Sequence, residues 1–268
     1  MSFYSSVIPF RLNLTMLFTD LVFAGISPAS HQKTFVYAVL DKGLNLLNLS
    51  DGTVDDVIAL LAGQSSVRTA INAPSGLSRG LSVEKKQDIF KTKKERALGS
   101  YRLGEAELRA RGIAVRGTPS KLEDCPEWMK AGFALYRKLE KGGFAKYPAE
   151  NELFQVLDTN SQACFCVMNG EMPQPKTSME GKIQRQLLLY ENGLKIKDPM
   201  DFFEEITRHK MLKGNWPMEL LYSSDQLDAM VAAFTAWATI HRPESVLSIG
   251  DPKEGRITLP VKDLKEKY

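Results

Sequence analysis

The feature that most constrains this sequence is a series of three short apolar runs that precede its first amphipathic helix. They span Leu21 to Ser27, Lys33 to Asp41 and Leu44 to Ser50, and a turn at Lys42-Gly43 separates the last two. Each run is rich in strand-forming residues. Because antiparallel neighbours can be joined by short connections, whereas parallel ones need a long crossover, the sequence predicts a three-stranded antiparallel meander.

The next two segments predict a helix and then a strand that runs parallel to a neighbour. Thr53 can cap a helix that carries apolar residues at helical spacing and stops at Gly63. The segment from Ser66 to Pro74 then reads as a fourth strand. Since a helix intervenes, this strand is expected to run parallel to a neighbour. The fold class predicted is therefore α/β: a mixed sheet, made of the meander plus parallel strands, flanked by helices.

The rest of the chain reads as mostly helical. One hairpin closes the sequence, from Val246 to Val261, with its turn at Asp251 to Gly255. The Cys164-Phe165-Cys166 segment is predicted to alternate in a partly buried strand, and a short strand is predicted at Phe144 to Pro148. Helices are predicted in the basic stretch Val83 to Arg111 and at Pro126 to Gly143, Glu150 to Leu157, Glu180 to Asn192, Pro199 to Lys210 and Ser223 to His241, the last with Ser224 as its cap.

Length and composition favour one large domain. With 268 residues, of which 43% are hydrophobic, the chain can bury a sizeable core, and we predict a single domain over residues 20–268. Residues 1–19 are expected to be an extension, either disordered or the product of a misassigned start, with Met16 as the alternative. Arg11 and Asn13 interrupt their apolar run, so we expect neither a signal peptide nor a membrane anchor. Three cysteines provide no disulfide framework, which favours a cytoplasmic location.

Positive charge is concentrated in one segment. Glu84 to Arg116 holds ten basic and five acidic residues, a net charge of +5, whereas the whole chain carries +3. Among these cations are Lys93 and Lys94, and Tyr101 offers a stacking face, so the segment can bind phosphate groups. The alternative is a solvated helix with i to i+4 ion pairs such as Glu105 with Arg109.

Six ordered segments carry a resemblance to a known family. They are FAGIS, INAPSGL, YRLGEAELRARGI, AKYPAENELF, DQLDAMVAAFTAW and GDPKEGRITLPV. From about Leu21 to Val261, the chain resembles the predicted RNase H-like nucleases called domain of unknown function 429. The resemblance implies an RNase H-like sheet, with a site where carboxylates from the first strand, the fourth strand and a late helix hold Mg²⁺ or Mn²⁺ for phosphodiester hydrolysis.

Several of the implied acidic positions are neutral in this sequence. The first-strand position is Ser27, the fourth-strand position is Asn72, and Ala145 replaces an acid before the tyrosine-proline pair. Only Asp225 and Asp228 remain, and both would also favour the first turn of a helix through its dipole. Hydroxyl and amide oxygens do not supply the charge that repays dehydration of Mg²⁺, so weak or absent metal binding is expected.

Two functions remain open on this basis. The first is a pseudo-enzyme that binds nucleic acid, a phosphorylated ligand or a protein partner beside Ser27 and Asn72, with Arg102, Glu105, Arg109, Lys93 and Lys94 as further ligand-binding candidates. The second is an active metal-dependent phosphodiesterase in which Asp225 and Asp228, with Glu105 or Asp41, form a shifted metal site. A purely structural role is the third alternative, since fold does not determine function.

Overall fold

The computed structural model describes residues 21–29, 34–84 and 101–268. Its strands form one sheet in the order β3-β2-β1-β4-β6-β8-β7, and β5 also pairs with β6. The strands are β1 (Leu21–Pro28), β2 (Phe35–Leu40), β3 (Leu46–Gly52), β4 (Ser66–Ile71), β5 (Ala145–Lys146), β6 (Phe154–Thr159), β7 (Leu247–Ile249) and β8 (Ile257–Leu259).

The predicted mixed sheet is confirmed. Strands β1, β2 and β3 pair antiparallel, β4 pairs parallel with β1, and β6 pairs parallel with β4. Strands β7 and β8 pair antiparallel and form the predicted hairpin, and β8 joins the sheet parallel to β6. The carboxyl ends of β1, β4 and β6 therefore meet at one edge of the sheet.

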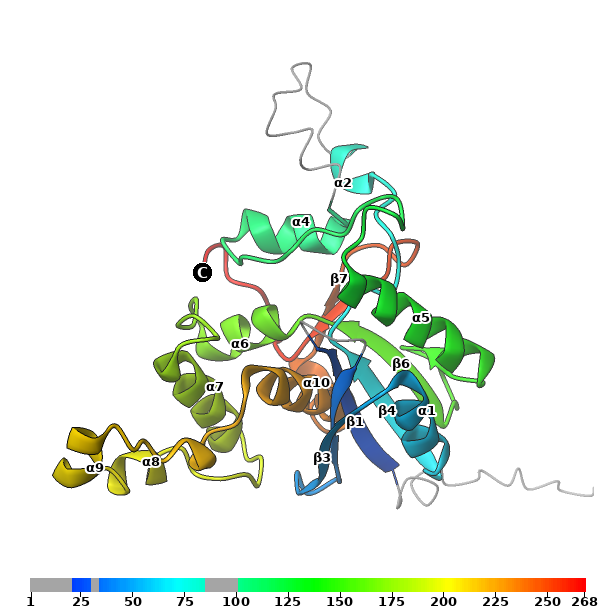
Figure 1. The fold of residues 1–268 in the computed structure, drawn as a ribbon. Coiled ribbons are helices and arrows are strands. Elements are labelled where there is room, and N and C mark those ends of the chain that lie inside the picture. Colours follow the sequence, from blue (N-terminus) through cyan, green and yellow to red (C-terminus); the bar gives the residue numbers. More distant parts are fainter. Residues whose placement is uncertain (1–20, 30–33, 85–100) are drawn as a thin grey trace, which may run out of the picture.

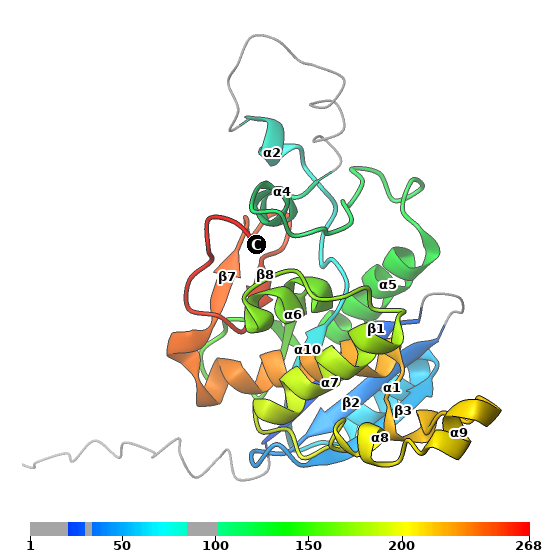
Figure 2. The same ribbon diagram turned by 90° about the vertical axis from the view of Figure 1, so that its left-hand side faces the viewer.

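Helices cover both faces of the sheet (Figure 1). The α-helices of the described residues are α1 (Val54–Ala62), α2 (Leu81–Glu84), α4 (Leu103–Ala110), α5 (Glu127–Lys141), α6 (Ser161–Asn169), α7 (Met179–Glu191), α8 (Asp201–Glu204), α9 (Arg208–Lys213) and α10 (Ser224–His241), with short 3-10 turns η2 (Met218–Leu220) and η3 (Pro243–Ser245). Helices α1 and α5 cover one face, and Figure 2 looks onto the face covered by α6, α7 and α10.

Strand alternation divides the core into two layers. In β1, Phe23 packs with the α10 layer, whereas Ala24 and Ile26 pack with α1 and α5. Gly25 lies on the α10 face, where a Cβ would come within 2.0 Å of the carbonyl oxygen of Ala229. This close approach brings the first turns of α10 against the carboxyl half of β1, and it needs a residue without a side chain.

Two predicted elements were wrong, and neither of the observed elements has an exposed residue. The second half of the segment predicted as a helix at Glu150 to Leu157 belongs to strand β6, which lies between β4 and β8. The Cys164 to Cys166 segment, predicted as a strand, lies in α6, which Asn160 caps and which ends at the left-handed Gly170. Elements buried on all sides lack the periodic polar face that distinguishes helix from strand in a sequence.

Other boundaries needed smaller corrections. The cap of α10 is Ser223, which forms a capping box with Gln226, rather than Ser224. The helix predicted over Pro199 to Lys210 is divided into α8 and α9, because Thr207 is extended and caps a new helix.

Some predictions fall on residues outside those described. The predicted basic helices are represented by α2 and α4, and residues 85–100 between them are not described. The proposed extension at residues 1–19 also lies outside the described residues. Within the described ranges, no helix combines the length and apolar character needed to span a membrane.

Candidate functional site

A cavity of about 500 Å³ opens where the carboxyl ends of β1, β4 and β6 approach the first turns of α6 and α10. Four of the predicted catalytic positions line it, together with Arg102 and Glu105. The lining includes Ser27, Asn72, Arg102, Glu105, Arg116, Trp128, Met129, Ser161, Lys176, Asp225 and Asp228. In open α/β sheets, this edge is where ligands usually bind.

Ser27 and Asn72 reach the cavity because both lie on the α10 side of the sheet. The Asn72 side chain donates from Nδ2 to Ser27 Oγ at 3.1 Å and accepts at Oδ1 from the backbone N–H of Ser161 at 2.9 Å. The amide therefore ties β1 and β4 to the first turn of α6. This bridging uses both ends of the amide, one as donor and one as acceptor.

Asp225 and Asp228 face the cavity from the first turns of α10. Asp228 is only 3% exposed, and Lys176 Nζ lies 2.9 Å from its Oδ2. The Ser161 hydroxyl also hydrogen-bonds to Asp228. Burial raises the pKa of Asp228, and the Lys176 charge opposes that shift. Burial, the largest single effect, lowers the pKa of Lys176, but the charge and hydrogen bond of Asp228 together with the charge of Asp225 outweigh it and raise the pKa, so the ammonium stays protonated at neutral pH.

Lys176 is held in place by the chain around it. The Ser224 hydroxyl donates to the backbone carbonyl of Lys176 at 2.6 Å. Arg185 is buried and donates to the carbonyls of Gln174 and Gly181 at 2.7 and 2.9 Å, which braces the loop before α7. These contacts fix the backbone from which the Lys176 side chain, itself 40% exposed, reaches the buried Asp228 carboxylate.

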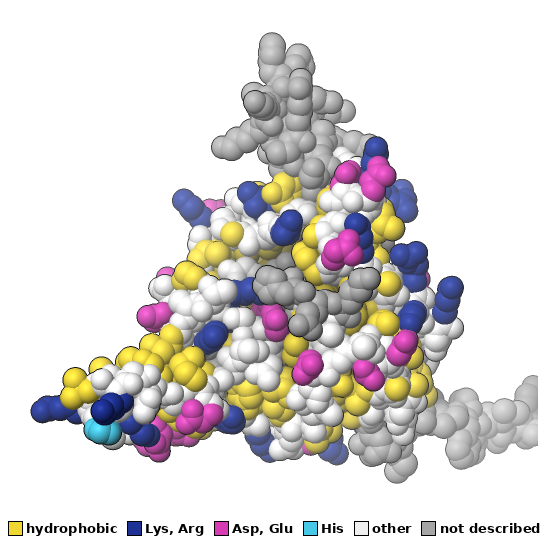
Figure 3. All heavy atoms as spheres, viewed as in Figure 1, with side chains coloured by type: hydrophobic (Ala, Val, Ile, Leu, Met, Phe, Trp, Pro, Cys, Tyr) yellow, Lys and Arg dark blue, Asp and Glu magenta, His cyan; other side chains and the backbone are white. Residues whose placement is uncertain are grey.

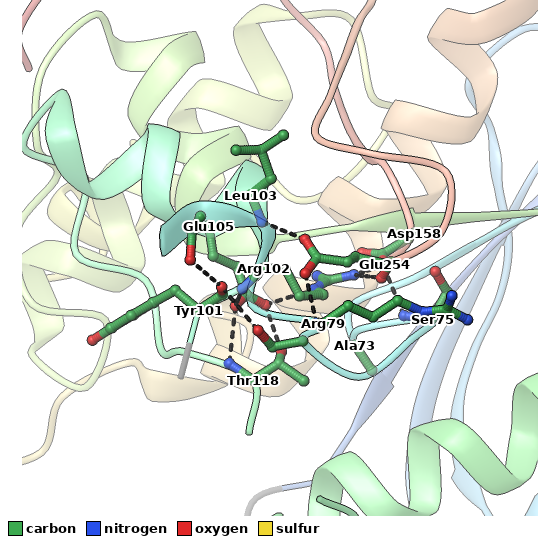
Figure 4. A network of polar contacts seen from close by, with 12 residues as sticks. Ala73, Ser75, Arg79, Tyr101, Arg102, Leu103, Glu105, Thr118, Asp158 and Glu254 are labelled. Atoms are coloured by element: carbon green, nitrogen blue, oxygen red, sulfur yellow. Dashed lines mark hydrogen bonds and ion pairs between the residues drawn. The ribbon is translucent and has the colours of Figure 1, made fainter. Parts of the chain in front are cut away.

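Arg102 belongs to a buried network that closes one side of the cavity (Figure 4). Its guanidinium contacts Glu105 and Asp158, and it also donates to the backbone carbonyl of Glu254 at 3.2 Å. The Asp158 carboxylate accepts from the backbone N–H of Ser75 at 2.7 Å. The network joins β6, the loop after β4, the start of α4 and the hairpin turn.

Two of the three acids of this network, Glu105 and Glu254, have both carboxylate oxygens engaged. Glu105 accepts from the Thr118 hydroxyl and backbone N–H, in addition to Arg102. Glu254 is completely buried and accepts from the backbone N–H groups of Arg79 and Leu103 at 2.6 and 2.7 Å. These contacts position the cavity wall, and they leave Glu105 without a free carboxylate oxygen to offer a metal ion.

The residues present do not fit a resident Mg²⁺ or Mn²⁺ ion. Mg²⁺ in proteins is usually held by one or two carboxylates, but the buried Asp228 carboxylate faces an ammonium, and the Ser27 and Asn72 side chains are neutral and hydrogen-bonded to each other. No group of three or more potential metal-ligating side chains of histidine, cysteine or acidic residues converges among the described residues. Asp41, considered for a shifted site, follows β2 at the opposite edge of the sheet, where it binds Asn45.

The remaining predicted ligand-binding residues lie elsewhere. The Arg109 guanidinium packs 4.8 Å from the Tyr101 ring centroid and donates to the carbonyl of Val115 at 3.1 Å, outside the cavity lining. Lys93 and Lys94 lie outside the described residues. Sequence reasoning missed Lys176, which lies in a proline-containing loop with no periodic pattern, and Asp158, because β6 was assigned to a helix.

Comparison with known proteins identifies a family. The model of the family described as protein of unknown function (DUF429) matches residues 25–255, from β1 to the turn of the C-terminal hairpin. No curated protein matches the chain. The match spans most of the sequence, from the second half of β1 to the turn before β8, so the chain belongs to the family of proteins of unknown function called DUF429.

Proposed function

We propose that the cavity is a metal-independent binding site for a phosphorylated ligand, and that the protein acts by binding rather than by phosphodiester hydrolysis. The observation that carries the proposal is the ion pair between Lys176 and Asp228. It places a fixed cation on the buried acid that would otherwise be the strongest remaining metal ligand. A divalent ion at the same carboxylate would face charge repulsion from the ammonium.

The cavity lining supports an anionic ligand with a flat or apolar part. Arg116 is exposed at the cavity and makes no ion pair within the described ranges, so its guanidinium is free to form bidentate contacts with a phosphate. Trp128 and Met129 provide an apolar wall. A volume near 500 Å³ suits a small molecule or one nucleotide rather than a duplex.

One observation favours the alternative of an active metal-dependent phosphodiesterase. Asp225 lines the same cavity, is only partly buried and has no ion pair in the part of the chain that the structure describes. With a displaced Lys176, Asp225 and Asp228 would supply two adjacent carboxylates. This function requires metal binding and turnover that both disappear in Asp225→Asn.

Calorimetry separates the two functions. Inorganic phosphate and a nucleoside monophosphate are titrated into wild type and Arg116→Ala, with Arg137→Ala as the control because Arg137 is an exposed arginine on α5 outside the cavity. Loss of a charge-assisted contact worth about 1.5–3 kcal/mol is expected to weaken binding roughly 10- to 100-fold in Arg116→Ala and to leave the control unchanged. Equal affinities in the two variants would contradict the proposal.

Metal titrations complete the test. Wild type is expected not to bind Mn²⁺ or Mg²⁺, and Ser27→Asp/Asn72→Asp is expected to gain little while Lys176 keeps its charge in place. The triple variant that adds Lys176→Ala is expected to bind Mn²⁺. Metal-dependent cleavage of labelled DNA or RNA by wild type, abolished in Asp225→Asn, would establish the alternative function instead.

A further inference from the structure

Exposed apolar side chains are concentrated in one projecting arm, which we define as residues 198–219. Six of the eleven large apolar side chains that are exposed among the described residues belong to it. They are Met200, Phe203, Met211, Leu212, Trp216 and Met218, and Leu212 is 83% exposed. Such a concentration of apolar side chains on a solvent-exposed surface usually marks an interaction site.

The arm is an ordered structure with its own anchors. Phe202 is fully buried, stacks on Trp216 at a centroid distance of 6.4 Å, and makes an edge contact with Phe203. Lys210 bridges the two helices of the arm through an ion pair with Glu205 at 2.7 Å. Figure 1 shows α8 and α9 extending away from the sheet, so the apolar side chains have no other part of the described chain to cover them.

The charges of the arm are divided between its two helices. Helix α8 and the residue after it carry Asp201, Glu204 and Glu205, whereas α9 carries Arg208, Lys210 and Lys213. Figure 3 shows dark blue side chains at the tip of the arm, magenta ones beneath it and apolar surface along it. In the described ranges, Glu204 and Arg208 have no ion-pair partner.

We propose that the arm binds the same arm of a second copy of this chain about a two-fold axis. In such an interface residue i meets residue j and j meets i, so the acidic helix of each copy lies on the basic helix of the other. The apolar side chains then lie between them. Three methionines suit this arrangement because their flexible side chains adapt to a partner surface. An anionic membrane matches the arm less well, because residues 198–219 hold five acidic residues against three basic ones.

Sedimentation velocity over a range of protein concentrations tests this inference. Wild type is expected to form a dimer, and Leu212→Asp is expected to weaken it at least roughly tenfold, because the dimer would bury an unpaired charge. Leu47→Asp is the matched control, since Leu47 is 56% exposed on β3, outside the arm. A wild type that stays monomeric at every concentration, or equal effects of the two substitutions, would overturn the proposal.

Charge exchange gives a second, independent readout. Glu204→Lys alone and Arg208→Glu alone are each expected to weaken the dimer, because each places like charges together. The double variant is expected to recover dimerisation, since a two-fold interface then pairs the exchanged charges again. Failure of the double variant to recover, or sedimentation of monomeric wild type with phosphatidylserine vesicles, would show that the arm serves a different partner.

Discussion

Replacement of Arg102 by methionine tests whether the buried network positions the cavity wall. Arg102 is fully buried, and its guanidinium is the cation that faces both Glu105 and Asp158. Removing one partner of a buried ion pair costs about 3–5 kcal/mol, because the other charge stays buried without compensation. That loss is a large part of the about 5–15 kcal/mol that typically stabilises a domain.

The assay is urea unfolding followed by far-ultraviolet circular dichroism. The matched control is Lys138→Met, which breaks the exposed ion pair with Asp55 and should cost less than about 1 kcal/mol. Wild type and control are expected to unfold at similar urea concentrations, and Arg102→Met at a much lower one. If the two variants lose similar free energies of unfolding, the network does not carry the stability assigned to it.

The free energy of unfolding of Arg102→Met should also depend on pH, and the direction of that dependence can be predicted. Burial raises the pKa of Asp158, and the Arg102 charge opposes that rise. Without Arg102 the pKa rises further, so the folded state binds a proton more tightly than the unfolded state does. Stability of the variant therefore increases as the pH falls from the raised folded pKa toward the unfolded value near 3.8. If the variant instead loses more free energy of unfolding relative to wild type as the pH is lowered mildly, this reasoning is refuted.

Three further predictions concern packing, capping and thiol reactivity. Gly25→Ala is expected to destabilise by at least about 3 kcal/mol in thermal unfolding, because its Cβ would lie 2.0 Å from a backbone oxygen of α10, whereas Gly63→Ala, with nothing nearer than 3.5 Å, should be nearly neutral. Ser223→Ala should lower the free energy of unfolding by about 1 kcal/mol through loss of the α10 cap, measurable in urea. All three cysteines are buried, and burial raises the pKa of Cys166 to about 11. A disulfide reagent should therefore label the cysteines only after unfolding, and rapid labelling of the folded protein would contradict this.

The order and direction of the first four strands could be predicted because their physical signals are local. Short connections required the meander, and the helix capped by Thr53 required a parallel return through β4. The signals failed for β6 and α6. Neither has an exposed face, so apolar residues such as Phe154 and Val156 fit a helix as well as a strand until their neighbours are known.

The candidate site was only partly accessible to sequence reasoning. Ser27, Asn72 and Asp228 were assigned to one site through the family resemblance, and the structure brings them to one cavity. The position of Lys176 depends on a loop with no periodic pattern and on its bracing by Arg185. A long-range contact of this kind leaves no trace in local spacing, which is why the cation that neutralises Asp228 was missed.

The charge balance of the cavity connects these observations. The described residues that line it include three cations, Arg102, Arg116 and Lys176, and three acids, Glu105, Asp225 and Asp228. A two-metal hydrolytic site needs a clear excess of negative charge, whereas this lining is neutral at neutral pH. Two of the cations, Arg102 and Lys176, are already held by acids, which leaves Arg116 as the cation and Asp225 as the acid without an ion pair in the described lining. Under the proposed function, the neutral side chains of Ser27 and Asn72 and the ion pair of Lys176 with Asp228 act in the same direction, because each limits the negative charge that the cavity can offer a metal ion.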